Sequence, residues 1–282
     1  MKPMKPMKPM KPMNKLKNYS LKEINDVTTP IFAQLADDVI DISKNAGEKI
    51  LTIYNSPDGF SYDSKKDSSP VTAADFAADE YIRSQLMLLT PEIPILSEEC
   101  LIEYDLRKHW SVYWLVDPLD GTREFIKKNG EFTVNIALIW NARPVLGVIH
   151  APAKEVTYWG FNHKAFKQES ETIQAIQPVT SIPPNISVSR SHRCEKIDEL
   201  LKNMSNFEIK SVGSSLKFCW LAEGKIQYYP RANSISIWDI AAGEAIVIAS
   251  GANMTDWDGN TIDYSPKESF VAPPFKAWYG NV

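Results

Sequence analysis

Two aspartates three residues apart are the residues of this chain best suited to chemistry. They belong to the sequence Asp-Pro-Leu-Asp-Gly-Thr at residues 117–122, which follows an apolar run at 113–116 that is typical of a buried strand. Pro118 fixes φ and Gly121 accepts positive φ, so the pattern predicts a strand that ends in a tight turn. Carboxylates held rigidly at such a turn can bind hard divalent cations such as Mg²⁺, which take oxygen ligands.

Two further acidic elements accompany this turn. Glu98 and Glu99 follow an apolar run at residues 93–96, and Asp239 lies near the start of a segment that predicts an apolar helix over 237–250. Each feature alone has an ordinary explanation as a turn, a solvated acidic pair or a helix-start charge. Together they indicate a metal-dependent phosphatase. The candidate ligands are Glu98, Asp117, Asp120 and Asp239.

Hydrolysis of a phosphate monoester needs an activated water and a stabilised leaving oxygen, and two metals about 3.5–4 Å apart can serve both needs. The carbonyl of Leu119, between the two aspartates, offers an extra oxygen ligand. Thr122 stands at an expected helix start, where its hydroxyl could orient a water and the N–H groups of Gly121 and Thr122 would point at a bound phosphate. The haloacid-dehalogenase motif places its two aspartates only two residues apart, so the spacing here disfavours an aspartyl-phosphate intermediate.

The composition is that of a globular protein with a substantial core. The 282 residues are 44% apolar and carry a net charge of −4, which argues against binding to a nucleic-acid polymer. No apolar run approaches the roughly 20 residues that span a membrane, and no secretory signal is evident. The three cysteines, Cys100, Cys194 and Cys219, lack the spacing of a disulfide framework or a zinc site. We expect a cytoplasmic protein, either a monomer or a homodimer.

Four copies of Met-Lys-Pro form residues 1–12. A proline at every third position prevents a continuous helix, so we expect residues 1–29 to be a disordered leader and linker. The positive charges of the lysines in this leader could attract it weakly to the cytoplasmic face of the inner membrane. Without an apolar face, that attraction is small.

Beyond the leader the pattern predicts an α/β fold with layered sheets and two subdomains, 30–180 and 181–282. Thr29 and Pro30 provide the cap and first residue of a helix. In the first subdomain we expect a loop at 56–69, a helix at 71–89 and an antiparallel meander with strands at 132–140, 144–150 and 155–161. In the second we expect strands at 186–189, 207–212 and 226–229, helices at 196–204, 214–223 and 237–250, and Gly251 as the C-terminal glycine of the last helix.

The motifs, in their order and separation, resemble the inositol-monophosphatase superfamily of Mg²⁺-dependent, lithium-sensitive phosphatases. Within it the chain is most similar to the bacterial 3′(2′),5′-bisphosphate nucleotidases, from about Pro30 to the C-terminus. The segments that carry this similarity are 69–75, 96–99, 113–125, 129–138, 189–192, 213–219 and 238–243. The resemblance implies an α-β-α-β-α sugar-phosphatase fold, with most metal ligands in the first subdomain and the last one in the second.

The resemblance also implies roles for the acidic residues. Glu98 would bind the first metal and contact the attacking water, Asp117 would bridge both metals, and the Leu119 carbonyl would complete the first site. Asp120 and Asp239 would hold the second metal near the leaving oxygen. The implied cofactor is two Mg²⁺, with a third as the upper limit.

Three further residues gain roles by resemblance. Thr122 would position the water together with Glu98, and Lys65 would lie near the site. Asp75 matches the acidic residue of a third, weaker metal site, although its spacing from Thr72 is also that of a capping box with Asp in place of Glu. The residues expected to contact substrate are Glu98, Leu119, Asp120, Gly121, Thr122, Gly213, Ser214, Ser215, Lys217, Arg231 and Asp239.

The implied reaction removes the 3′-phosphate of adenosine 3′,5′-bisphosphate, a by-product of sulfate activation and sulfo-transfer, and gives AMP. An inositol phosphate or a fructose bisphosphate is the alternative substrate. It is disfavoured because Ala232, beside Arg231, occupies the position where inositol-specific relatives have a Glu. A catalytically silent nucleotide-binding or scaffold protein is a third hypothesis, disfavoured because every expected metal ligand is present.

Overall fold

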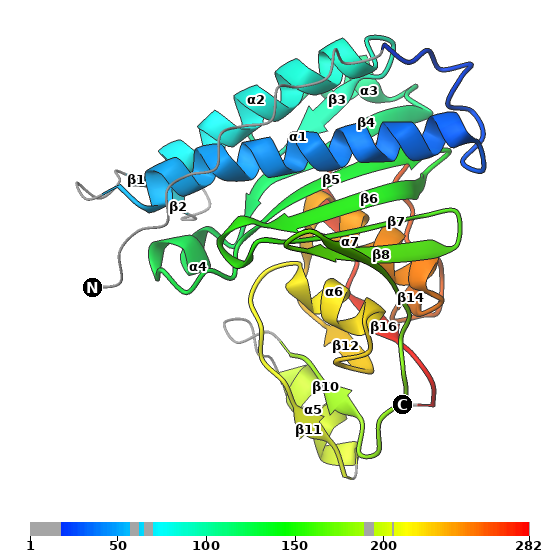
Figure 1. The fold of residues 1–282 in the computed structure, drawn as a ribbon. Coiled ribbons are helices and arrows are strands. Elements are labelled where there is room, and N and C mark those ends of the chain that lie inside the picture. Colours follow the sequence, from blue (N-terminus) through cyan, green and yellow to red (C-terminus); the bar gives the residue numbers. More distant parts are fainter. Residues whose placement is uncertain (1–17, 57–61, 65–69, 189–194, 205, 282) are drawn as a thin grey trace.

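The computed structural model describes residues 18–56, 62–64, 70–188, 195–204 and 206–281. Its elements stack in layers: two helices, a seven-stranded sheet, two further helices, a five-stranded sheet and a last helix (Figure 1). The expected α/β layered class is therefore confirmed. The Met-Lys-Pro repeat at 1–12, Lys65 and the segment 189–192 lie outside the described residues. The expectation of a disordered linker up to residue 29 is wrong for residues 18–29, because Tyr19 and Ile24 are buried in the core formed with the first two helices.

The outer helix pair consists of α1 (Pro30–Tyr54) and α2 (Ala73–Leu89). Thr29 Oγ1 accepts a hydrogen bond from the N–H of Phe32 at 3.1 Å, which confirms the predicted cap. The predicted start of the second helix is wrong by two residues, because Pro70–Thr72 forms strand β2 and pairs antiparallel with β1 (Tyr62–Ser64). The stretch 56–69, expected to be a loop, thus contains a short strand.

The seven-stranded sheet has the order β3-β4-β5-β6-β7-β8-β9. The predicted meander is confirmed, with a tight turn in which Asn141 and Ala142 have positive φ. Two strands that the sequence analysis did not predict, β8 and β9, extend this sheet. Strand β9 is its largely exposed edge, and β8 lies between β7 and β9. The strands are β3 (Ile95–Ser97), β4 (Val112–Asp120), β5 (Thr133–Trp140), β6 (Arg143–Ala151), β7 (Val156–Phe161), β8 (Lys164–Glu169) and β9 (Thr172–Ile176).

Strand β4 departs from the prediction at Asp117, the first of the two candidate metal-binding aspartates. The expected turn at Asp117 is absent, and the strand continues to Asp120 with an irregularity in its pairing with β5. Asp117 pairs with Asn135 and Asp120 with Thr133, so three steps along β4 match two along β5. Such a bulge re-aims side chains, and here it lies between the two aspartates.

The two faces of the sheet belong to different cores. On β5, Ile136 and Leu138 pack toward α1 and α2, whereas Ala137 and Ile139 join the core around α6 (Leu216–Ala222) and α7 (Trp238–Ser250). Helix α7 is buried on nearly all sides because sheets cover it from both directions. It ends at Gly251 with φ of 93°, as predicted.

Glycines allow α7 to lie unusually close to the large sheet. A Cβ at Gly147 on β6 would lie 2.3 Å from the carbonyl oxygen of Ala242 and 2.8 Å from the Cβ of Ala245. Replacing Gly147 with alanine should therefore destabilise the protein by about 1–3 kcal/mol, which corresponds to a loss of roughly 2–12 °C in Tm. Thermal unfolding measures this. Lys164→Ala, an exposed change on the same sheet, is the control and should leave Tm nearly unchanged.

The five-stranded sheet has the order β11-β10-β12-β16-β14, and helix α5 (Glu195–Asn203) packs on its outer face. Tyr228 contacts α5 residues while its neighbour Tyr229 joins the core of α6 and α7, as expected for a strand covered on both sides. The three predicted strands have shifted bounds: they are β10 (Asn185–Ile186), β11 (Glu208–Ile209) and β12 (Tyr228–Arg231). Two strands of this sheet were not predicted, β14 (Asn253–Asp256) and β16 (Phe275–Trp278).

The division into two subdomains near residue 180 stays a prediction. The chain leaves the large sheet at Ile176 and enters the smaller one at Asn185, but α7 is packed by both sheets.

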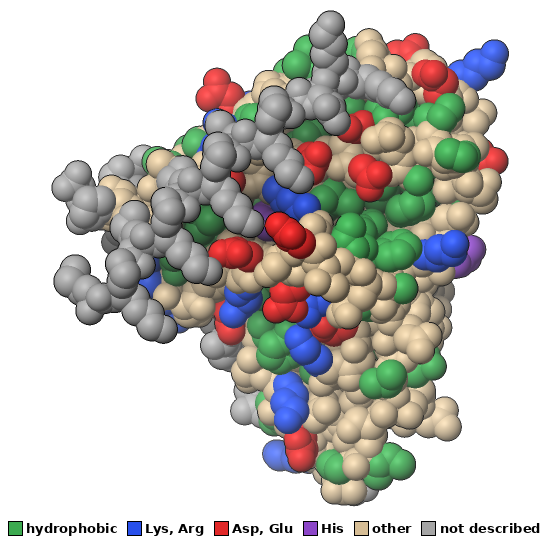
Figure 2. Space-filling view, in the orientation of Figure 1, with side chains coloured by type: hydrophobic (Ala, Val, Ile, Leu, Met, Phe, Trp, Pro, Cys, Tyr) green, Lys and Arg blue, Asp and Glu red, His purple; other side chains and the backbone are tan. Residues whose placement is uncertain are grey.

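On the face shown in Figure 2, Lys and Arg side chains lie among Asp and Glu side chains rather than in one basic stripe. No helix among the described residues is long and apolar enough to cross a membrane.

Candidate active site

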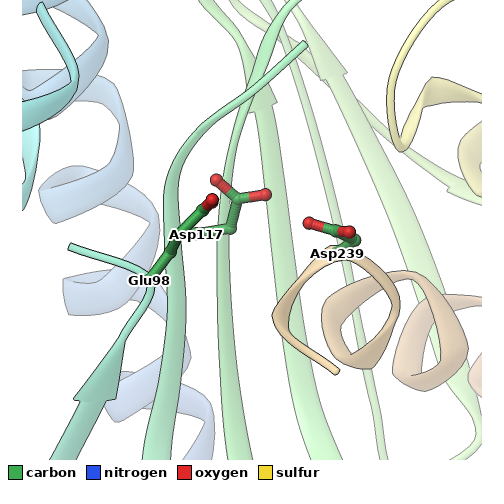
Figure 3. A group of neighbouring side chains, drawn as sticks. All are labelled: Glu98, Asp117 and Asp239. Atoms are coloured by element: carbon green, nitrogen blue, oxygen red, sulfur yellow. The ribbon is translucent and has the colours of Figure 1, made fainter. Parts of the chain in front are cut away.

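Three carboxylates from separate elements converge between the large sheet and α7. Glu98 follows β3, Asp117 lies within β4, and Asp239 is in the first turn of α7 (Figure 3). One carboxylate oxygen of each lies within 4.8 Å of the others. Three acids so close repel one another unless cations or protons separate them, so these oxygens could hold a divalent cation.

Pairing of adjacent strands places Glu98 beside Asp117. Strand β3 runs parallel to β4, and the N–H of Glu98 donates to the carbonyl of Val116 at 3.1 Å. The preceding residue, Ser97, donates its hydroxyl to Asp79 on α2, and Asp79 also pairs with Arg83 at 2.7 Å. The end of β3 is therefore tied both to its neighbouring strand and to α2.

Asp117 is the most deeply buried member of the group, with no exposed surface. Burial raises the pKa of its carboxyl well above the usual value, and repulsion from Glu98, Asp120, Asp239 and Asp75 adds to the shift. Its Oδ1 accepts the N–H of Leu119 at 3.1 Å, whereas Oδ2 has no hydrogen-bond partner among the described residues. A buried carboxylate oxygen without a donor, facing two other acids, suits a cation ligand.

Burial also raises the pKa values of Asp239 and Asp120, but their charged neighbours differ. Burial, followed by repulsion from Asp120 and Glu98, raises the pKa of Asp239 to about 8. Its Oδ2 accepts the N–H of Ser236 at 3.1 Å. Burial also raises the pKa of Asp120, but the positive charge of Lys217 and a hydrogen bond from the N–H of Ser215 oppose that rise. Asp120 thus faces the opposite wall of the site.

These pKa shifts set the pH dependence of stability. An unfolded aspartate has a pKa near 3.8, whereas Asp239 in the folded, ion-free protein keeps its proton up to a pH of about 8. The folded state therefore binds more protons, so its free energy of unfolding should fall as the pH rises from about 3.8 to about 8. Mg²⁺ needs the ionised carboxylates and should relieve this loss. We expect Mg²⁺ to raise Tm more near pH 8 than near pH 6 in thermal unfolding. An equal rise at both pH values would contradict the proton-linked site.

The carboxylates open into a cavity of about 320 Å³. Every residue predicted to contact substrate lines it, whereas Asp75 does not. Asp75 is 1% exposed on α2 behind the site and acts on Asp117 through its charge. The capping-box prediction involves Thr72, whose side chain lies outside the described part of the chain.

The bulged strand and the helix after it shape one wall of the cavity. Thr122 begins helix α4 (Thr122–Ile126), as predicted, and Gly121 precedes it with φ of 90°. The hydroxyl of Thr122 donates to the carbonyl of Leu119 at 3.4 Å. Leu119 and Thr122 are therefore in contact, and both line the cavity.

Cationic side chains form the opposite wall. Lys217 is 6% exposed and its Nζ donates to the carbonyl of Ser214 at 2.9 Å. Arg231 ends β12, and its Nε is buried with no hydrogen-bond partner among the described residues. A cavity with acids on one side and cations on the other can hold a metal-bound phosphate ester and its further anionic groups.

Some lining residues were not predicted. They come from α4, from the loop before α6, from α6 and from β12: Arg123, Glu124, Val212, Phe218 and Tyr229. Ser234, Ile235 and Ser236 also line the cavity, and they belong to the segment before Asp239, which the family resemblance implies lies against the nucleoside. Tyr229 and Phe218 have the apolar character of core residues, so only their place in the fold reveals that they border the cavity.

Comparisons with known proteins identify the family of this chain. A family profile described as "Inositol monophosphatase family" matches residues 33–281. The 3′(2′),5′-bisphosphate nucleotidase CysQ of Salmonella typhimurium is 49% identical over 242 residues, which cover 86% of this chain and 98% of that protein. The namesake protein of Buchnera aphidicola is 42% identical, covering 91% of this chain and 99% of the relative.

Solved structures support the same relationship. The crystal structure of CysQ from Bacteroides thetaiotaomicron matches with a TM-score of 0.77 and 36% identity, over 91% of this chain and 100% of that one. The Thermotoga maritima IMPase matches with a TM-score of 0.70 and 24% identity, over 86% of this chain and 91% of that one, which supports the fold.

Proposed function

Because the chain belongs to the inositol monophosphatase family, we propose that its acidic cavity removes the 3′-phosphate of adenosine 3′,5′-bisphosphate and releases AMP. The predicted resemblance to 3′(2′),5′-bisphosphate nucleotidases is confirmed by relatives up to 49% identical. The observation that carries the proposal is the convergence of Glu98, Asp117 and Asp239 in a cavity that Lys217 and Arg231 also line.

The donor set of the cavity fits Mg²⁺. Its candidate ligands are carboxylate and carbonyl oxygens, and one buried oxygen of Asp117 has no donor among the described residues. Glu98, Asp117 and the Leu119 carbonyl would hold one ion, and Asp117, Asp120 and Asp239 would hold a second. Asp75 would serve a third, weaker site. When bound, the ions supply an activated water and offset the charge that develops on the leaving oxygen.

The protein's own groups would orient the reactants. The Thr122 hydroxyl donates its proton to the Leu119 carbonyl, so its lone pairs are available to accept a hydrogen bond from the attacking water. Glu98 would accept a second hydrogen bond from that water. Two acceptors fix the orientation of a water molecule and help to remove its proton.

The cationic wall favours a nucleotide over an inositol. The substrate carries a second phosphate, and Lys217 and Arg231 would bind it while Gly213–Ser215 contacts the nucleoside. Ala232 offers no carboxylate to a polyol hydroxyl. We further propose that Li⁺ inhibits the reaction and that the protein acts in sulfur metabolism. Its proposed location is the cytoplasm, with weak peripheral contact with the inner membrane. The state in solution is a monomer or a homodimer.

Product analysis tests the proposal. Adenosine 3′,5′-bisphosphate incubated with the protein and Mg²⁺ should give AMP and phosphate, and chelation should stop the reaction. Li⁺ should slow it. Release of adenosine 3′-phosphate, the product of cleavage at the 5′ position, would overturn the proposed orientation of the substrate.

A further inference from the structure

The turn at residues 213–215 precedes α6, and it is held by side chains from β4, from β5 and from the residues just before β5. The N–H of Gly213 donates to Glu131 Oε2 at 2.8 Å, and the N–H of Ser215 donates to Asp120 Oδ2 at 2.5 Å. The Ser215 hydroxyl bonds to Asn135 at 2.8 Å. Each of these contacts joins residues at least 80 positions apart. The large sheet therefore fixes the turn.

Glu131 is itself held in position before it meets the turn. Its N–H donates to Asn129 Oδ1 at 2.9 Å, which fixes the backbone just before β5. Gly213 lies so close that an added Cβ would stand 3.1 Å from the Cβ of Glu131 and 2.7 Å from the Cγ of Glu124. The absence of a side chain at Gly213 thus lets its N–H reach the carboxylate.

Glu131 is separate from the metal-binding carboxylates. It is not a member of the cluster of Glu98, Asp117 and Asp239, and it does not line the cavity. Its hydrogen bond acts on the backbone of a segment that does line it. A change at Glu131 should therefore affect the shape of the nucleotide-facing wall without removing a ligand from the cation site.

We propose that Glu131 is a positioning residue for the nucleotide, which holds the turn 213–215 in its binding geometry by accepting the N–H of Gly213. The inference rests on the proposed function, since it requires that this turn contact the substrate. The acceptor oxygen of Glu131, rather than its negative charge, holds the turn in place. Without it the turn relaxes, the nucleotide binds more weakly, and the chemical step at the metal site proceeds as before.

The test compares Glu131→Ala with Glu131→Gln, because glutamine keeps an acceptor oxygen. Loss of one such hydrogen bond should raise KM for adenosine 3′,5′-bisphosphate about tenfold and leave kcat within about twofold. Glu131→Gln should restore KM to within about threefold. AMP binding by calorimetry should weaken in parallel with KM, and the rise in Tm on adding Mg²⁺ should stay at the wild-type value in both variants.

Several outcomes would overturn the inference. An unchanged KM in Glu131→Ala would show that the turn does not depend on this bond, and a glutamine variant no better than alanine would assign the effect to charge. A fall in kcat together with a smaller Mg²⁺-induced rise in Tm would assign Glu131 to the metal site. Wild-type protein that neither binds AMP nor hydrolyses the bisphosphate would contradict the proposed function itself. Glu208→Ala, an exposed change on β11, is the matched control.

Discussion

Asp117→Asn should lower kcat for phosphate release by about a thousandfold or more, and it should at the same time stabilise the ion-free protein. The activity falls because Asp117 is the buried carboxylate through which both ions would be held, and a loss of about 4 kcal/mol in transition-state stabilisation is roughly a thousandfold in rate. The stability rises because burial and four neighbouring acids raise the pKa of this carboxyl, and an amide carries no charge to bury.

Steady-state kinetics and thermal unfolding without Mg²⁺ measure the two effects. Asp105→Asn is a matched control, since Asp105 is exposed on a short helix and, within the described part of the chain, forms an ion pair only with Lys108. This control variant should change neither kcat nor the Tm of the ion-free protein. Retained activity in Asp117→Asn would contradict the two-metal site. A lower Tm of the ion-free variant would contradict the electrostatic strain assigned to Asp117.

Asp239→Asn should reduce kcat by about a hundred- to a thousandfold while the fold and nucleotide binding persist. The asparagine keeps an oxygen that accepts the N–H of Ser236, so the start of α7 stays capped. What the variant loses is the negative charge that would hold the second ion near the leaving oxygen. AMP binding should remain within a few fold of wild type, because the Lys217 and Arg231 side chains are unchanged.

The kinetic constants and AMP affinity of this variant are compared with those of Asp258→Asn. Asp258 lies on an exposed turn after β14, so its substitution should have no effect. A normal kcat in Asp239→Asn would remove Asp239 from the catalytic group. A loss of AMP binding equal to the loss of kcat would instead make it a nucleotide contact.

The acidic residues could be predicted because each follows or begins an apolar run that is recognisable in the sequence. Strand β3, strand β4 and helix α7 all lie where the apolar patterns indicated, within a few residues. The meeting of Glu98 with Asp117 then depends on the parallel pairing of β3 and β4. No local pattern encodes that pairing, so the resemblance to a family carried the prediction.

Features that depend on pairing between distant segments were missed. The bulge between Asp117 and Asp120 arises from the match of β4 to β5, and Pro118 and Gly121 suggested a turn instead. The contact of Asp120 with Ser215 joins residues 95 positions apart and has no sequence signature. Strand β9 was missed because its polar residues show no buried face.

We propose that the acidic cavity is a divalent-metal site that selects a nucleoside bisphosphate. The most direct test compares kcat/KM for adenosine 3′,5′-bisphosphate and for inositol 1-phosphate with the same protein, with Mg²⁺ and with chelator. We predict that the bisphosphate is preferred by at least about a hundredfold, as expected for losing roughly 3 kcal/mol of contacts from the cationic wall, and that chelation abolishes both reactions. Faster release of phosphate from inositol 1-phosphate, or activity that survives chelation, would contradict it.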